Sequence, residues 1–134
     1  MKIQNKEVVL NFKTAADYDL LVCREKGLRG IFAVASGIRQ EVSRLEKKFG
    51  KKSDDLTDEE RGEFNMPLNF AEIFLLAQAT LGLSEDEVAR LMEKELDTRS
   101  VIEIGMDFVN ELMSSKVFVA AKIQAEDENP KQPK

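Results

Sequence analysis

Hydrophobic and polar positions alternate at helical spacing over most of the chain, most clearly near its middle. Asn69 and Glu72 form a capping box there, and apolar residues then recur every three or four positions until Gly82. Ser84 and Glu87 form a second box, which begins another amphipathic helix. The pattern predicts two helices joined by a tight corner. The first is apolar on nearly every side and is therefore expected at the buried centre.

The N-terminal stretch alternates in a different way. In residues 2–12, apolar and polar side chains alternate on both sides of a polar corner at Asn5, which predicts a short β-hairpin. A lone hairpin is marginal in water, so it must pack on the helices or on another chain. Thr14 then offers a helix cap, with Asp17 in the box position, for a helix that spans residues 15–26.

An apolar stripe at about 100° per residue predicts a further helix, which ends at Gly50. The stripe consists of Ile31, Val34, Ile38, Val42, Leu45 and Phe49. Gly37 lies inside this helix, where glycine is unfavourable, and it indicates a close helix crossing or a kink.

The charged segment 51–67 follows, and within it Thr57 and Glu60 can cap one short helical turn. Its composition allows two interpretations. It is either a mobile, solvated loop or a segment that orders on a partner, with Phe64 and Met66 as its apolar contacts.

Ser100 and Glu103 cap the last predicted helix, which carries two apolar stripes side by side. The first stripe consists of Val101, Ile104, Phe108 and Leu112, and the second of Ile102, Met106, Val109, Met113 and Val117. A helix on one small core needs only one such stripe. The helix is therefore either buried centrally or forms a protein-binding surface, to which we also assign Phe118, Phe64 and Met66.

The chain has 134 residues, 43% hydrophobic and 34% charged, which predicts a mainly α-helical protein. We expect one domain over residues 1–122 and a flexible, polar tail over residues 123–134. No apolar run reaches the about 18 residues of a membrane span, and the N-terminus lacks the features of an export signal. The lone Cys23 fits a reducing compartment and is expected to behave as a small core residue.

The net charge of −5 disfavours binding to a phosphate backbone. The absence of histidine removes the usual general base and the commonest metal ligand. The acidic clusters also lack the spacing of a calcium loop. The stretch LGLSEDEVARLM resembles the first helix of a helix-turn-helix, but no basic recognition helix follows it. We therefore expect no catalytic, cofactor, metal or nucleic-acid site.

The order of these parts resembles the tail assembly chaperones of long, non-contractile-tailed phages. The opening KIQNKEVVLNFKTAADYDL is similar to the hairpin and amphipathic helix of that family. The stretches FAEIFLLAQATLGLSEDEVARLMEKEL and VIEIGMDFVNELMSSKVFVAAK are similar to its central and closing helices. The resemblance covers most of residues 2–122 and is one of layout, from which the long segment 51–67 departs.

The resemblance implies a non-enzymatic, self-associating protein of the host cytoplasm that is absent from the mature virion. Such a protein coats the tape measure protein while tube subunits polymerise around it. A longer form, made by ribosomal frameshifting, recruits the tail tube protein. The codons of Asn129, Pro130 and Lys131 can form a slippery heptamer, so we expect the frameshift there, unless the C-terminus is an ordinary solvated tail. The apolar surface of the last helix and the free hairpin edge also predict a homo-oligomer.

Three other classes of protein remain open from the sequence. A small helical transcriptional regulator would bind DNA, and a helical adaptor would bind one helix of a cellular partner. A cation-dependent enzyme built on the acidic segment fits least well, because no acidic cluster has the required spacing.

Overall fold

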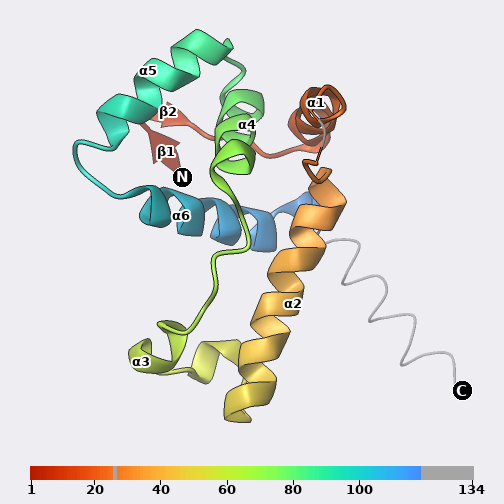
Figure 1. Ribbon diagram of the computed structural model, residues 1–134, viewed down its shortest axis with the longest axis vertical. Helices are drawn as coiled ribbons and strands as arrows, with labels where there is room; N and C mark the ends of the chain where they lie inside the picture. Colours follow the sequence, from red (N-terminus) through yellow and green to blue (C-terminus); the bar gives the residue numbers. More distant parts are fainter. Residues whose placement is uncertain (26, 119–134) are drawn as a thin grey trace, which may run out of the picture.

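The hairpin and the helices follow one another in the predicted order (Figure 1). The structure, a computed structural model, describes residues 1–25 and 27–118. Its elements are β1 (Lys2–Ile3), β2 (Lys6–Glu7), α1 (Phe12–Val22), α2 (Ile31–Phe49), the 3₁₀ turn η1 (Ser53–Asp55), α3 (Asp58–Arg61), α4 (Phe70–Leu81), α5 (Glu85–Glu95) and α6 (Val101–Ser114). The predicted fold class, mainly α with an N-terminal hairpin, is confirmed. The predicted tail, 123–134, lies outside the described residues.

The predicted capping boxes are present at the start of α3, α4, α5 and α6. At α4, the Asn69 side chain accepts from the Glu72 N–H at 2.8 Å, and the Glu72 carboxylate accepts from the Asn69 N–H at 3.0 Å. Gly50 and Gly82 end α2 and α4 in the left-handed conformation, with φ of 64° and 65°. These local signals set the starts of α3, α4, α5 and α6 and the ends of α2 and α4.

The predicted start of α1 is wrong by three residues. Asn11, not Thr14, is the cap, and Thr14 occupies the third helical position of the box. The Thr14 hydroxyl accepts from the Asn11 N–H at 2.9 Å and donates to the Val9 carbonyl at 2.7 Å, so it ties the helix to the segment that follows the hairpin. The helix ends at Val22. Cys23 follows it and is exposed, which corrects its predicted place in the core.

Replacing Asn11 with alanine is expected to lower the free energy of unfolding by about 1 kcal/mol, because the Thr14 N–H loses its acceptor. Asp17→Ala is the matched control, since Asp17 only pairs with the exposed Lys13. Urea unfolding followed by circular dichroism compares the two variants. An equal or larger loss in Asp17→Ala would contradict the assignment of the cap.

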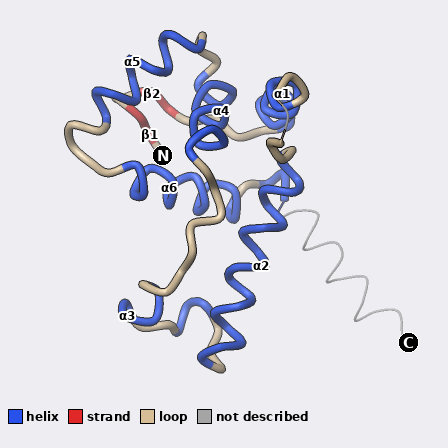
Figure 2. The backbone as a smooth tube through the Cα atoms, in the orientation of Figure 1, coloured by secondary structure: helices blue, strands red, loops and turns tan. Residues whose placement is uncertain are grey.

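Helix α4 lies between α1, α5 and α6, as the predicted buried centre (Figures 1 and 2). The main core gathers side chains from the hairpin and from α1, α2, α4, α5 and α6. Its largest fully buried members include Tyr18, Phe108, Ile3, Ile38, Leu76, Ile104 and Leu112. One part of α4 departs from the prediction, because Phe70, its first residue, is 73% exposed.

The second half of α2 extends away from this core and carries η1 and α3 (Figure 1). Glu46 accepts from the Ser53 N–H at 2.9 Å, and Glu41 accepts from the Asn65 N–H at 2.6 Å. Leu56 is buried there. The segment 51–67 therefore packs on α2. It does not extend freely into solvent, as the interpretation of a mobile, solvated loop implied.

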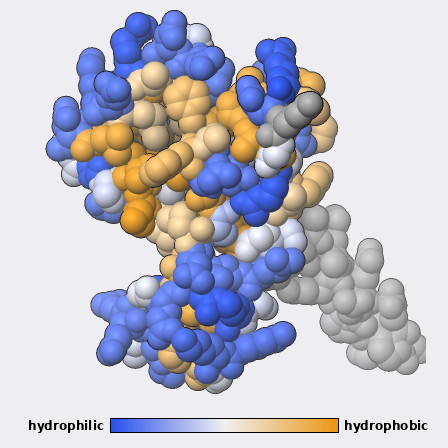
Figure 3. Space-filling model, in the orientation of Figure 1, coloured by the Kyte–Doolittle hydropathy of each residue, from blue (hydrophilic) through white to orange (hydrophobic). Residues whose placement is uncertain are grey.

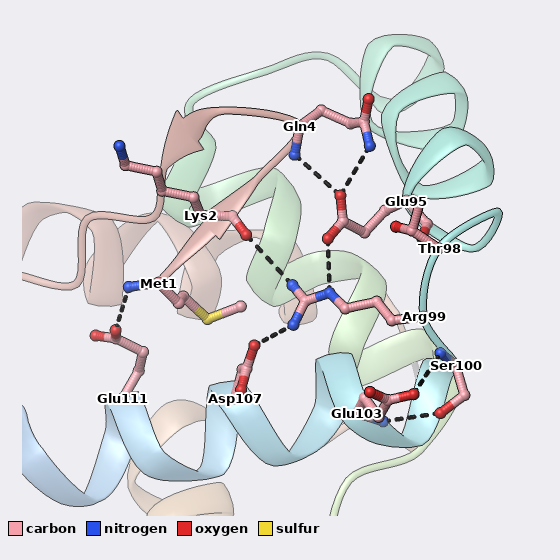
Figure 4. Close-up of polar contacts among 10 residues, drawn as sticks. All are labelled: Met1, Lys2, Gln4, Glu95, Thr98, Arg99, Ser100, Glu103, Asp107 and Glu111. Atoms are coloured by element: carbon pink, nitrogen blue, oxygen red, sulfur yellow. Dashed lines mark hydrogen bonds and ion pairs between the residues drawn. The ribbon is translucent and has the colours of Figure 1, made fainter.

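Polar contacts fix the hairpin on α5 and α6 (Figure 4). Glu95 accepts from the Gln4 backbone N–H at 3.1 Å and from the Gln4 amide at 2.9 Å. Arg99 donates to Glu95 at 2.6 Å, to the Lys2 carbonyl at 3.3 Å and to Asp107. Burial raises the pKa of the Glu95 carboxyl, but the hydrogen bonds from Gln4 and Arg99 outweigh burial and hold it below 4.5. The hairpin thus packs on its own helices.

Candidate protein-binding groove

An apolar groove of about 290 Å³ opens between the first turns of α4 and α6. It is lined by Met66, Leu68, Asn69, Phe70, Ile73, Val101 and Ile102. Leu68 and Ile73 are buried, whereas Phe70 and Ile102 are 73% and 63% exposed. Figure 3 shows hydrophobic atoms across the middle of the upper lobe, while the lobe formed by the end of α2 and α3 is mostly hydrophilic on this face.

The capping boxes explain why the two apolar side chains are exposed. Phe70 is the first residue of α4 and Ile102 is the second residue of α6. The caps Asn69 and Ser100 fix the backbone at these positions, so each side chain leaves the helix at its very end, beside the core and not within it. Single exposed apolar side chains are common, but two at the rim of one apolar groove form a patch of the kind that a partner covers.

Close packing of α6 on α4 shapes the base of this groove. A Cβ atom added to Gly105 would lie 3.1 Å from both Ile73 Cδ1 and Met66 Cε. Glycine at this position therefore lets Met66 and Ile73 approach the backbone of α6. The groove follows from this approach, since larger side chains would separate the two helices.

An ion pair between the half-exposed Arg29 and the buried Glu72 positions the start of α4. Glu72 is 1% exposed and accepts from Arg29 Nε and Nη2, both at 2.8 Å, while Nη2 also donates to the Pro67 carbonyl at 2.6 Å. The buried Tyr18 hydroxyl donates to the Arg29 carbonyl at 3.1 Å. A Cβ atom on Gly37 would lie 2.8 Å from Arg29 Nη1. Gly37 therefore makes room for the guanidinium group, and α2 runs through it without interruption.

The ion pair also sets the protonation of its members. Burial raises the pKa of the Glu72 carboxyl, but hydrogen bonds from the Arg29 guanidinium and from the Asn69 N–H outweigh burial, so the pKa lies below 4.5. Burial raises the pKa of the Tyr18 hydroxyl, and the nearby Glu72 charge adds to this effect. Glu72 is therefore charged and Tyr18 neutral near pH 7, and the charged Glu72 holds the Arg29 guanidinium group that donates to the Pro67 carbonyl.

The predicted interface residues separate into three groups. Ile102 and Met66 line the groove. Phe64, Met106, Met113 and Val117 are half-buried and pack against the core. Val109 and Phe118 are 4% and 5% exposed, so these two belong to the interior and not to a free surface.

The second predicted stripe of α6 is also shorter than expected. Helix α6 ends at Ser114, and Ser115 adopts an extended conformation with ψ of 137°. The Ser115 hydroxyl then accepts from the Val117 N–H at 3.2 Å. Val117 therefore follows the end of α6 and does not continue its stripe.

Sequence reasoning missed Phe70 as a surface residue, because its apolar neighbours in α4 placed it within a buried helix. Its position directly after the cap Asn69 was the available signal. Other exposed apolar side chains do not line this groove. Phe12 on α1 is 82% exposed. Phe32 on α2 is 72% exposed, and its ring meets that of Phe118 edge to face, with 5.8 Å between the ring centroids.

Within residues 1–25 and 27–118, no three His, Cys, Asp or Glu side chains are grouped so that they could hold a metal ion. No helix in this part of the chain is both long enough and apolar enough to cross a membrane. No protein-family model matches the chain, and no curated protein or solved structure is significantly similar to it.

Proposed function

We propose that this chain is a tail assembly chaperone of a long, non-contractile-tailed phage. It acts without enzymatic chemistry in the host cytoplasm, self-associates, and coats the tape measure protein while the tail tube is built. The observation that carries the proposal is the pair of exposed side chains, Phe70 and Ile102, in one apolar groove. The layout described above, with the hairpin followed by helices, agrees with the family resemblance of the sequence.

The groove suits an apolar helix face of the tape measure protein. Two exposed anchors at its rim and a buried base of Leu68 and Ile73 match the way amphipathic helices dock in apolar grooves. The half-buried Met66 adds an adaptable side chain to this surface. Such a site recognises apolar area more than sequence, as a coat on a long protein requires.

The proposal includes a second partner, the tail tube protein, through a longer frameshifted form of the chain. The codons in question encode residues 129–131, which lie outside the described residues. The nucleotide sequence tests this part: a slippery heptamer near these codons with an open overlapping frame supports it, and an immediate stop in the shifted frame removes it.

Phe70→Asp combined with Ile102→Asp is expected to abolish capture of the co-expressed tape measure protein. Each anchor should cost about 2 kcal/mol or more of binding energy, as central apolar contacts do. Both positions lie in a first helical turn, where an acidic side chain favours the helix dipole, so the fold should persist. The measurement is affinity capture followed by size-exclusion chromatography with light scattering.

The control is Phe12→Asp, which changes a similarly exposed phenylalanine at the first position of α1, outside the groove. It should leave capture unchanged. The mass of the complex separates a coat from an adaptor, because a coat places many copies on one tape measure chain. A one-to-one complex would favour the adaptor, and capture by the double variant would contradict the role of the groove.

A further inference from the structure

The outer face of α2 carries a basic stripe in a chain whose net charge is −5. We use this name for Ser36, Arg39, Gln40, Ser43, Arg44 and Lys47, which line a shallow groove of about 540 Å³. All are exposed, and none is acidic. Arg44 is bound to Glu41 and to a backbone carbonyl. Arg39 and Lys47 form no ion pair with any residue that the structure describes.

Helix α5 carries a charge pattern of the opposite sign. Glu85, Asp86 and Glu93 are exposed and lie within about 100° of one another around the helix, and we call them the acidic stripe. They form no ion pair within the described part of the chain. Arg90 and Lys94 lie on the neighbouring face of α5. The helix dipole accounts for acids in the first turn, but not for Glu93 two turns later.

The two stripes lie toward opposite ends of the molecule. With the longest axis vertical, α5 is at the top of Figure 1 and the second half of α2 is at the bottom. The stripes therefore do not meet within one chain. A contact between the stripe of one copy and that of the next is heterologous, and it repeats along a row or closes into a ring.

We propose that the basic stripe of α2 in one copy docks on the acidic stripe of α5 in the next copy. This inference rests on the proposed function, because a row of copies joined end to end is the arrangement that a coat on a long protein needs. Charge complementarity within the same sequence selects a second copy as the occupant. A nucleic acid fits less well, since the stripe has only three basic side chains, of which Arg44 is already paired.

Charge reversal on each side tests the contact. The first variant is Arg39→Glu with Lys47→Glu, and the second is Glu85→Lys with Glu93→Lys. At about 0.05 M salt, where charges are weakly screened, each should weaken self-association at least about tenfold in sedimentation velocity. In an equimolar mixture, both stripes of each variant meet the opposite charge on the other variant, so the two should co-assemble in alternation. A chain with all four substitutions should assemble again.

Matched controls keep the change of net charge and leave the stripes intact. Arg24→Glu with Lys52→Glu, and Asp54→Lys with Glu59→Lys, change exposed residues elsewhere and should assemble as the wild type does. Circular dichroism should be the same for all chains, since every substituted side chain is exposed.

Undiminished assembly of both reversed variants would overturn this contact and leave the proposed chaperone function in place. Binding of duplex DNA that Arg39→Glu with Lys47→Glu abolishes, without an effect on assembly, would also overturn it. A wild-type chain that stays monomeric at all concentrations would remove both the contact and the self-association in the proposed function.

Discussion

Val109→Lys is expected to lower the free energy of unfolding by about 4 kcal/mol or more and to lower the thermal unfolding midpoint strongly. Val109 is 4% exposed on α6, so the substitution places an unpaired ammonium group in the main core. Thermal unfolding followed by circular dichroism measures the loss. Small domains have only about 5–15 kcal/mol of stability in total, which makes this one change decisive.

Ile102→Lys is the matched control, since Ile102 belongs to the same predicted stripe and is 63% exposed. It should leave the stability within about 0.5 kcal/mol of the wild type. The pair of variants therefore separates the interior part of the stripe from its exposed end. Similar losses in both, or a stable Val109→Lys protein with native helical content, would contradict this division.

Arg29→Met is expected to cost about 3 kcal/mol at pH 7, because it leaves the Glu72 carboxylate buried without its cation. This is the lower end of the range for broken buried pairs, since the Arg29 side chain is 40% exposed and partly screened by solvent. Lys13→Met breaks the exposed pair with Asp17 and should change the stability by no more than about 0.5 kcal/mol.

The effect of Arg29→Met should depend on pH in a defined direction. In the wild type the pKa of Glu72 is below 4.5 in the folded state, so its contribution is complete above that value and is lost as the pH falls through the folded pKa. Without Arg29, burial raises this pKa, and the folded variant takes up a proton at higher pH than the unfolded chain. The difference between the two proteins should therefore shrink toward pH 4. Urea unfolding across this range measures it, and a constant difference would contradict the role of the ion pair.

Local signals in the sequence predicted helix ends well, because a capping box involves only four residues. Four of the boxes are where they were expected. The predicted start of α1 was wrong because Asn11 and Thr14 are both good caps, and the choice depends on the contact of Thr14 with Val9, between the hairpin and the helix. Ser115 interrupts a run whose apolar spacing continues to Val117, so periodicity alone overestimated the stripe.

Contacts between distant residues had no signal in the sequence. Arg29 and Glu72 are 43 positions apart, and Gln4 and Glu95 are 91 positions apart. The groove depends on such contacts, since Arg29 holds Pro67 below it and Gly105 admits Met66 beside α6. The sequence could therefore indicate excess apolar surface on the last helix, but not that its exposed end meets the first turn of α4.

Hydrogen–deuterium exchange of the chain, alone and bound to its tape measure protein, tests the central claim most directly. The partner helix should exclude water from the groove and slow exchange of the backbone amides in residues 66–75 and 100–105. The exchange rates of the amides on the outer face of α1 should be the same with and without the partner. Binding that leaves exchange in these two segments unaltered, or no binding at all, would contradict the account.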